Sequence, residues 1–74
     1  MIFRHRVKEF RTNHQWSQEA LGAKVGVSRQ TIISIESYRY NPSLELGMKL
    51  AHAFKVPIDT LFYFVFQSFD QEQD

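Results

Sequence analysis

A helix over residues 29–36 would carry a row of side chains suited to contacting the bases of a nucleic acid. The segment reads RQTIISIE after Ser28, and helical spacing turns Ile32 and Ile35 to one side. The opposite side then holds Ser28, Arg29, Gln30, Ile33 and Ser34. Arginine can form two hydrogen bonds to guanine, glutamine can form two to adenine, and isoleucine can pack on a thymine methyl group. We predict that these five side chains read base edges; the alternative is a helix face exposed only to water.

A second set of polar residues is suited to the phosphate groups of a DNA backbone. A serine at the start of a helix places a short hydroxyl beside free backbone amides, which suits an anion. In the loop SYRYN, an arginine lies between two tyrosines that can donate their hydroxyls. The predicted phosphate-binding residues are Ser17, Gln18, Ser37, Arg39, Tyr40, Asn41 and Ser43. For Tyr40, packing against the helices is an equally good interpretation.

The sequence does not contain the patterns of a catalytic or metal-binding site. The chain has no cysteine, and His5, His14 and His52 lack the spacing and the neighbouring carboxylates of a metal site. It also has no Gly-x-Ser-x-Gly elbow and no Gly-rich phosphate loop. We therefore expect a protein that is not an enzyme and that uses no metal, cofactor or small-molecule effector.

Length and charge fit a small domain that faces a polyanion. A chain of 74 residues forms one domain, near the lower size limit for a single stable core. Residues 1–42 hold seven Lys and Arg against three Glu, a net charge of +4, whereas residues 43–74 hold two Lys against five acidic residues, a net charge of −3. No apolar run approaches the ~20 residues of a membrane-spanning helix, and no apolar leader opens the chain. We expect a cytoplasmic protein without a membrane partner.

Five short helices are predicted to position these side chains in an all-α fold. The expected segments are 6–13, 17–25, 28–36, 43–54 and 57–62. The second, third and fourth segments each open on a serine that can cap the first turn. The last begins at Pro57, a residue that favours the first turn of a helix.

The second and third helices, with the turn Gly26-Val27 between them, have the pattern of a helix-turn-helix. Gly22 lies where the two helices cross, and Gly26 lies at the end of the first helix, where a left-handed conformation is needed. The inward apolar positions are Leu21, Val25, Val27, Ile32 and Ile35. Such a set, at fixed spacing around a short turn, predicts two helices locked at a fixed angle.

The stretch WSQEALGAKVGVSRQTIISIE, together with NPSLELGMKLAHAFKVPIDTLF, resembles the DNA-binding domain of the Cro/repressor-type (XRE) helix-turn-helix regulators of phages and bacteria. The resemblance covers about residues 5–62, and GVSRQTI and YNPSLEL are similar to the small, single-domain cytolysin repressor type. It implies a lambda-repressor-like domain of five helices, with base contacts at Arg29, Gln30 and Ser34. It also implies a partly buried salt bridge between Arg11 and Glu36.

Two positions depart from this family pattern. After Glu36 the family usually has Asn-Gly, where this chain has Ser37-Tyr38. Because a tyrosine in the left-handed region would cost about 1–2 kcal/mol, we expect the loop to follow another path. Lys55 stands where Gly or Asn is common, so we expect strain in that turn too.

The run LFYFVFQSF near the end of the chain is predicted to be a strand over about residues 63–69. As a strand it places Phe62, Phe64 and Phe66 on one side, where they could cover the core of the domain. The other side is too apolar for water, and residues 1–3 could pair with the strand. We predict a dimer interface made of Tyr63, Phe64, Val65, Phe66 and Phe69. The alternative is aromatic packing within a monomer.

These features together predict a sequence-specific DNA-binding transcriptional regulator, with residues 1–74 forming a single domain. In its simplest form it is a repressor that binds a palindromic operator as a homodimer through the helix 29–36. The competing prediction is a protein-interaction module, or an antitoxin-like partner protein, with the same fold.

Overall fold

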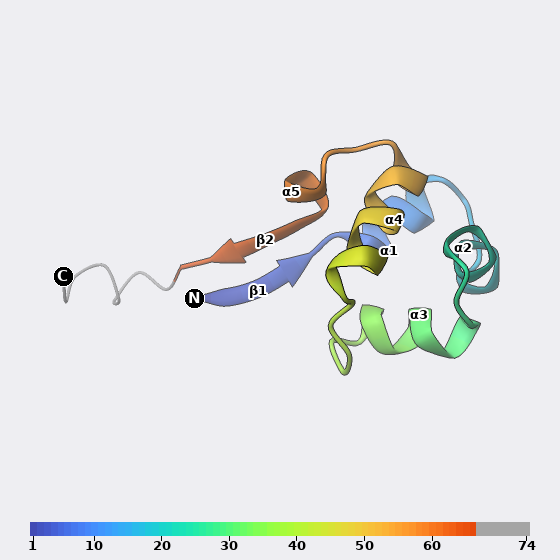
Figure 1. Cartoon of the computed structure of the whole chain (residues 1–74), viewed down its shortest axis with the longest axis horizontal. Helices are drawn as coiled ribbons and strands as arrows, with labels where there is room; N and C mark the ends of the chain where they lie inside the picture. The colour runs from blue at the N-terminus through green and yellow to red at the C-terminus, as the bar shows by residue number, and fades with distance from the viewer. Residues whose placement is uncertain (67–74) are drawn as a thin grey trace, which may run out of the picture.

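The computed structural model describes residues 1–66, which form five helices and one two-stranded antiparallel sheet (Figure 1). The elements are β1 (Ile2–His5), α1 (Val7–Asn13), α2 (Gln18–Val25), α3 (Arg29–Glu36), α4 (Leu44–Phe54), α5 (Ile58–Leu61) and β2 (Phe62–Val65). The mostly helical prediction is confirmed. Helix α5 is shorter than expected because the chain turns extended at Phe62 and enters β2 directly. None of the helices within residues 1–66 combines the length and the apolarity needed to cross a membrane.

Three serines start three of the helices, as predicted. The hydroxyls of Ser17, Ser28 and Ser43 accept hydrogen bonds from the backbone N–H three residues later, at 2.9, 3.2 and 3.2 Å. Gly26 ends α2 with a φ of 80°, the left-handed conformation expected of it. These bonds satisfy backbone groups that a helix end leaves free, so the boundaries of α2, α3 and α4 follow from local sequence.

The core lies between the helices, which bury one apolar side each. Its fully buried side chains are Val7, Leu21, Ile32, Ile35, Leu50 and Leu61. Trp16 packs beside them and stacks on Phe54, with ring centroids 5.6 Å apart. A Cβ on Gly22 would lie 2.6 Å from the carbonyl oxygen of Val27, so the close packing of α2 against the turn requires glycine.

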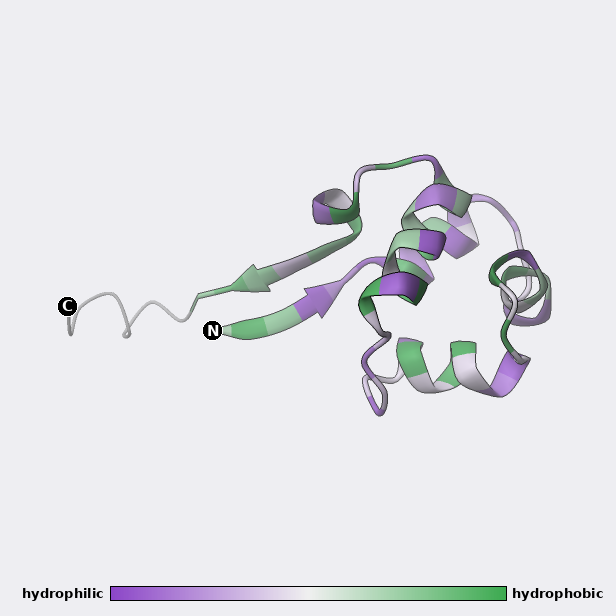
Figure 2. Cartoon of the chain, viewed as in Figure 1, coloured by the Kyte–Doolittle hydropathy of each residue, from purple (hydrophilic) through white to green (hydrophobic). Residues whose placement is uncertain are grey.

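Strands β1 and β2 form an arm that extends away from the helices (Figure 1). They pair in register from Ile2 with Val65 to His5 with Phe62, which confirms the expected partner for the aromatic run. The free ends of both strands are apolar, as Figure 2 shows. We call β1 and β2 together the arm.

The prediction that one side of β2 covers the core is right only for Phe62. Phe62 is half-buried and its ring lies against Gly47 of α4, whereas Phe64 and Phe66 are 57% and 60% exposed. The reason is that the arm leaves the helical body after Phe62, so the later residues have no core to cover. The described strand ends at Val65, and the predicted residues Gln67–Phe69 lie outside the described part of the chain.

The prediction that the Ser37-Tyr38 loop avoids a left-handed residue is wrong. Tyr38 has a φ of 63°, and its ring stacks on His5 while its hydroxyl hydrogen-bonds the His5 backbone. These contacts offset the steric cost of the conformation. The strain expected at Lys55 is confirmed, because its φ is 60°.

Candidate nucleic-acid interface

The outer surface of α3 begins with two exposed polar side chains, Arg29 and Gln30. Ile32 and Ile35 are completely buried, so the helix cannot rotate about its axis without exposing them. Ile33 and Ser34 are half-buried along the same outer side. In Figure 1, α3 runs along one edge of the helical body, where a groove of DNA could meet it.

The Ser28 hydroxyl already has two partners inside the protein. It accepts a hydrogen bond from the Thr31 N–H at 3.2 Å and lies 3.1 Å from the Thr31 hydroxyl. Among the five predicted base-reading residues it is therefore the one most occupied by the protein itself. Its main task in this geometry is to cap α3.

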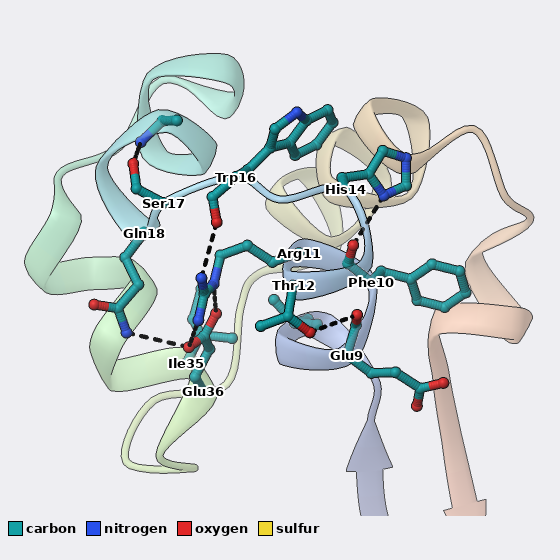
Figure 3. A network of polar contacts seen from close by, with 12 residues as sticks. Glu9, Phe10, Arg11, Thr12, His14, Trp16, Ser17, Gln18, Ile35 and Glu36 are labelled. Carbon is teal, nitrogen blue, oxygen red and sulfur yellow. Dashed lines mark hydrogen bonds and ion pairs between the residues drawn. The ribbon is translucent and has the colours of Figure 1, made fainter.

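At the start of α2, the side chains of Ser17 and Gln18 both have partners inside the protein. The side-chain amide of Gln18 donates to Glu36 at 3.2 Å, so it is turned toward α3 (Figure 3). The Ser17 hydroxyl is exposed while it caps the helix. An anion at this end would therefore meet the first backbone N–H groups of α2 and the Ser17 hydroxyl.

The loop after α3 folds back onto the end of that helix. The Ser34 carbonyl accepts hydrogen bonds from the N–H groups of Arg39 and Tyr40, at 3.0 and 3.2 Å, and from the Ser37 hydroxyl at 3.2 Å. As a result, Gln30, Ser34 and Tyr40 line one shallow hollow. Arg39 and Asn41 are exposed in the same loop, and Ser43 caps α4 just after it. The fold thus brings Ser28, Gln30, Ser34 and Tyr40 around one hollow and leaves Arg39 and Asn41 exposed in the adjoining loop.

Arg11 and Glu36 form the ion pair that the family resemblance implies. The Arg11 Nε donates to Glu36 Oε2 at 2.6 Å and its Nη2 donates to Oε1 at 3.1 Å, while Nη1 donates to the Trp16 carbonyl at 2.9 Å. The two side chains are only 12% and 6% exposed. Figure 3 shows Arg11 of α1 reaching between Trp16 and Glu36, so the pair ties α1 to the end of α3.

His5 and Tyr38 are two residues whose part in the structure the sequence reasoning missed. Buried at the base of the arm, His5 lies 3.0 Å from the Ile35 carbonyl through its Nε2. Burial lowers the pKa of His5, against the smaller raising effects of its bond to Ile35 and of the nearby Glu36. The signal available in the sequence was the tyrosine standing where the family places glycine.

The described residues offer no candidate metal centre. Within residues 1–66, no three His, Cys, Asp or Glu side chains gather closely enough to hold an ion. The chemistry of this surface is that of hydrogen-bond donors and positive charge.

Comparisons with known proteins agree with this geometry. The sequence profile of the helix-turn-helix family matches residues 7–61. An uncharacterized HTH-type transcriptional regulator of Archaeoglobus fulgidus is 48% identical over 61 residues, which are 82% of this chain and 87% of the relative. One from Bacillus subtilis is 43% identical over 60 residues, 81% of this chain and 91% of the relative.

Solved structures of similar fold include two DNA-binding proteins. The P22 c2 repressor, solved in complex with a synthetic operator, has a TM-score of 0.71 and 31% identity, covering 73% of this chain and 82% of the repressor chain. The N-terminal DNA-binding domain of SinR from Bacillus subtilis has a TM-score of 0.69 and 30% identity, covering 74% and 81%. The chain therefore belongs to the helix-turn-helix family of the Cro/repressor (XRE) type, a family of DNA-binding transcriptional regulators and not of enzymes.

Proposed function

We propose that the protein is a transcriptional repressor that binds a palindromic operator as a homodimer, with α3 in the major groove. The observation that carries this proposal is the exposed pair Arg29 and Gln30 at the start of a helix held in place by buried Ile32 and Ile35. In helix-turn-helix proteins it is this end of the second helix that reaches the base edges. Ile33 and Ser34 would extend the same reading surface.

Backbone contacts on both sides of α3 would hold the domain in register. Arg39, Tyr40 and Asn41 are exposed beside the end of α3, and the first turn of α2 offers free backbone amides beside Ser17. Such contacts supply affinity without sequence information. The part of the chain that contains α2 and α3, residues 1–42, has a net charge of +4, which favours contact with DNA.

The arm supplies a surface for the dimer. Phe64, Val65 and Phe66 are 57%, 43% and 60% exposed, and the exposure of such an apolar group to water is unfavourable. In an antiparallel pair, main-chain groups of alternate residues point away from the partner strand. The N–H and C=O of His5 point away from β2 to the Tyr38 hydroxyl, so Tyr38 covers the edge of β1 at that point. His5 pairs with Phe62, and Phe64 lies two positions further along β2. The N–H and C=O of Phe64 therefore point out from the edge of β2, where a second copy can pair.

Binding-site selection from random DNA, followed by titrations at several salt concentrations, tests the proposal. We expect the selected sites to be two-fold symmetric, with half-site centres one helical turn, ~34 Å, apart. Arg29→Ala should abolish the base preference. The matched control is Arg39→Ala, which should weaken binding about equally on every sequence and reduce the dependence on salt. Absence of any retained DNA at low salt would refute the proposal.

The competing function, a protein-interaction module, is favoured by one feature. Leu44 and Met48, one turn apart on α4, are 73% and 57% exposed beside an open groove of about 1170 Å³ that reaches Trp16 and α2. In that case the protein would retain no DNA at low salt and would bind a partner protein in this groove. Met48→Glu should then abolish binding of the partner protein. If the protein is a DNA-binding repressor, Met48→Glu should leave its DNA binding unaffected.

A further inference from the structure

The arm joins the helical body through Phe62, the first residue of β2, which packs on Gly47, and through the last residue of β1, His5. Its Nε2 lies 3.0 Å from the carbonyl oxygen of Ile35 in the last turn of α3, and its Nδ1 lies 3.4 Å from the N–H of Val7 at the start of α1. A carbonyl can only accept, so Nε2 carries the proton and Nδ1 accepts from Val7. The neutral ring thus attaches the end of β1 to two helices at once.

Tyr38 holds the same residue through its ring and its main chain. Its ring stacks on the His5 imidazole, with centroids 4.4 Å apart and an interplanar angle of 18°. Its hydroxyl accepts a hydrogen bond from the His5 N–H and donates one to the His5 carbonyl, both at 3.2 Å. The Arg4 guanidinium lies 5.3 Å from the centre of the Tyr38 ring. One side chain therefore contacts both the last residue of β1 and its neighbour.

Tyr38 makes these contacts from an unfavourable backbone conformation. Its φ of 63° is a conformation that glycine adopts freely and that any side chain makes costly. Glycine would serve the turn after α3 better, but it would leave the arm without the ring and the hydroxyl. The tyrosine is thus unfavourable for the loop and favourable for the attachment of the arm.

We propose that Tyr38 is a positioning residue: it fixes the angle between the arm and α3, and so the distance between the two copies of α3 in a dimer. Only the part about the distance between the two copies of α3 rests on the proposed function. A rotation of about 15° at His5 would move the far end of a four-residue strand, ~13 Å long, by ~3.4 Å. That is about the rise of one base pair, ~3.4 Å, so a small loss of angle alters the spacing of half-sites that the dimer can bind.

The first test measures the angle without DNA. Residual dipolar couplings of backbone amides in the arm and in the helices should fit one alignment tensor in the wild-type protein. In Tyr38→Gly the helices should keep a common tensor, while the arm should show a smaller and differently oriented one. Tyr38→Phe keeps the ring and loses both hydroxyl bonds, so we expect a smaller change in the same direction. An arm that keeps the wild-type tensor in Tyr38→Gly would overturn the proposal.

Lys55→Gly is the matched control. Lys55 has nearly the same backbone conformation, with a φ of 60°, but it lies at the end of α4. Its replacement relieves the same kind of strain, so we expect the arm couplings to remain as in the wild type. A change of the arm in this control equal to that in Tyr38→Gly would show that strain, and not the contact with His5, sets the angle.

The second test measures spacing on DNA. The wild-type protein should lose on the order of tenfold in affinity when one base pair is added between half-sites, a loss similar to that typical of one mismatched base pair. Tyr38→Gly should read the same half-site sequence but lose less than about threefold for the added base pair. Equal spacing preference in the two proteins would contradict the inference. If the wild type binds no DNA, the proposed function fails, and the dipolar couplings still decide the role of Tyr38.

Discussion

Arg11 and Glu36 act at the scale of single residues by holding α3 in place from behind. Their side chains are 12% and 6% exposed and share three hydrogen bonds with each other and with the Trp16 carbonyl. Loss of one partner would leave the other charge in a poorly solvated place. We expect Glu36→Ala to lower the free energy of unfolding by about 3 kcal/mol, measured by urea denaturation.

The double variant Arg11→Met, Glu36→Leu controls for the loss of charge. It removes both charges and restores apolar volume, so it should be more stable than either single variant. A cost well below 1 kcal/mol for Glu36→Ala would indicate that the pair behaves as an exposed surface ion pair.

His5 should make stability depend on pH. Burial lowers its pKa in the folded protein, and the nearby Arg4 acts in the same direction, while Glu36 and the bond to Ile35 oppose it. The unfolded chain, with an ordinary pKa of 6.5, then binds the proton more readily than the folded one. The neutral His5 therefore makes its full contribution to the free energy of unfolding above pH 6.5. That contribution is lost as the pH falls from 6.5 through the lowered pKa, by at most about 1.4 kcal/mol per pH unit.

This dependence is measured by urea denaturation between pH 7 and pH 5. His5→Gln, which can still donate to the Ile35 carbonyl, should flatten the curve in that range. Equal slopes in the wild type and in His5→Gln would refute the assignment.

Single residues were predictable where their role is local. The capping serines and the left-handed Gly26 act on backbone groups within four residues, so their roles can be derived from sequence. Tyr38 could not be placed in this way because the residue that offsets its strained backbone, His5, lies 33 positions away. A local cost was visible in the sequence, whereas the distant contact that balances it was not.

At the scale of elements, the angle between α2 and α3 depends on Gly22. An added Cβ would lie 2.6 Å from the Val27 carbonyl, which belongs to the turn and cannot move aside without shifting α3. We expect Gly22→Ala to lower the free energy of unfolding by about 2 kcal/mol, despite the better helix propensity of alanine. Thermal or urea denaturation measures this change.

Gly47→Ala is the control for Gly22→Ala. There the nearest atom to an added Cβ is the edge of the Phe62 ring, at 3.4 Å, an ordinary contact distance. Alanine should leave stability unchanged or raise it by up to about 1 kcal/mol. If both variants lose the same stability, the close approach at the turn is not what requires Gly22.

The elements themselves were predictable to different degrees. Helices α2, α3 and α4 carry a cap and an apolar period, so their extents follow from sequence. The start of β2 was predicted to within one residue, because its aromatic residues and Val65 favour a strand. Its register with β1 is harder to predict, since pairing is a contact between residues about sixty positions apart. The exposure of Phe64 likewise depends on where the arm leaves the helices.

At the scale of the whole molecule, the structure combines a compact helical body with an apolar arm. The body presents α3 on one edge, and the arm extends from another part of it (Figure 1). For a palindromic operator both are needed, since one domain contacts few base pairs and a two-fold dimer doubles the contact. The oligomeric state is therefore the property on which the proposed function most depends.

We expect the wild-type protein to sediment as a dimer at micromolar concentration and Phe64→Glu to sediment as a monomer. Phe64 is 57% exposed and lies at the open edge of β2, so a charge there opposes a second copy without disturbing the core. Met48→Glu is the matched control, because Met48 is equally exposed, at 57%, but lies on α4. It should remain a dimer. Circular dichroism should show the same helix content in all three proteins.

Phe64→Glu should also bind operator DNA more weakly while each half-site keeps its base preference, since α3 is unchanged. A wild-type mass that stays monomeric at every concentration would contradict the role given to the arm, and would leave the contacts of α3 with single half-sites as the whole of the binding.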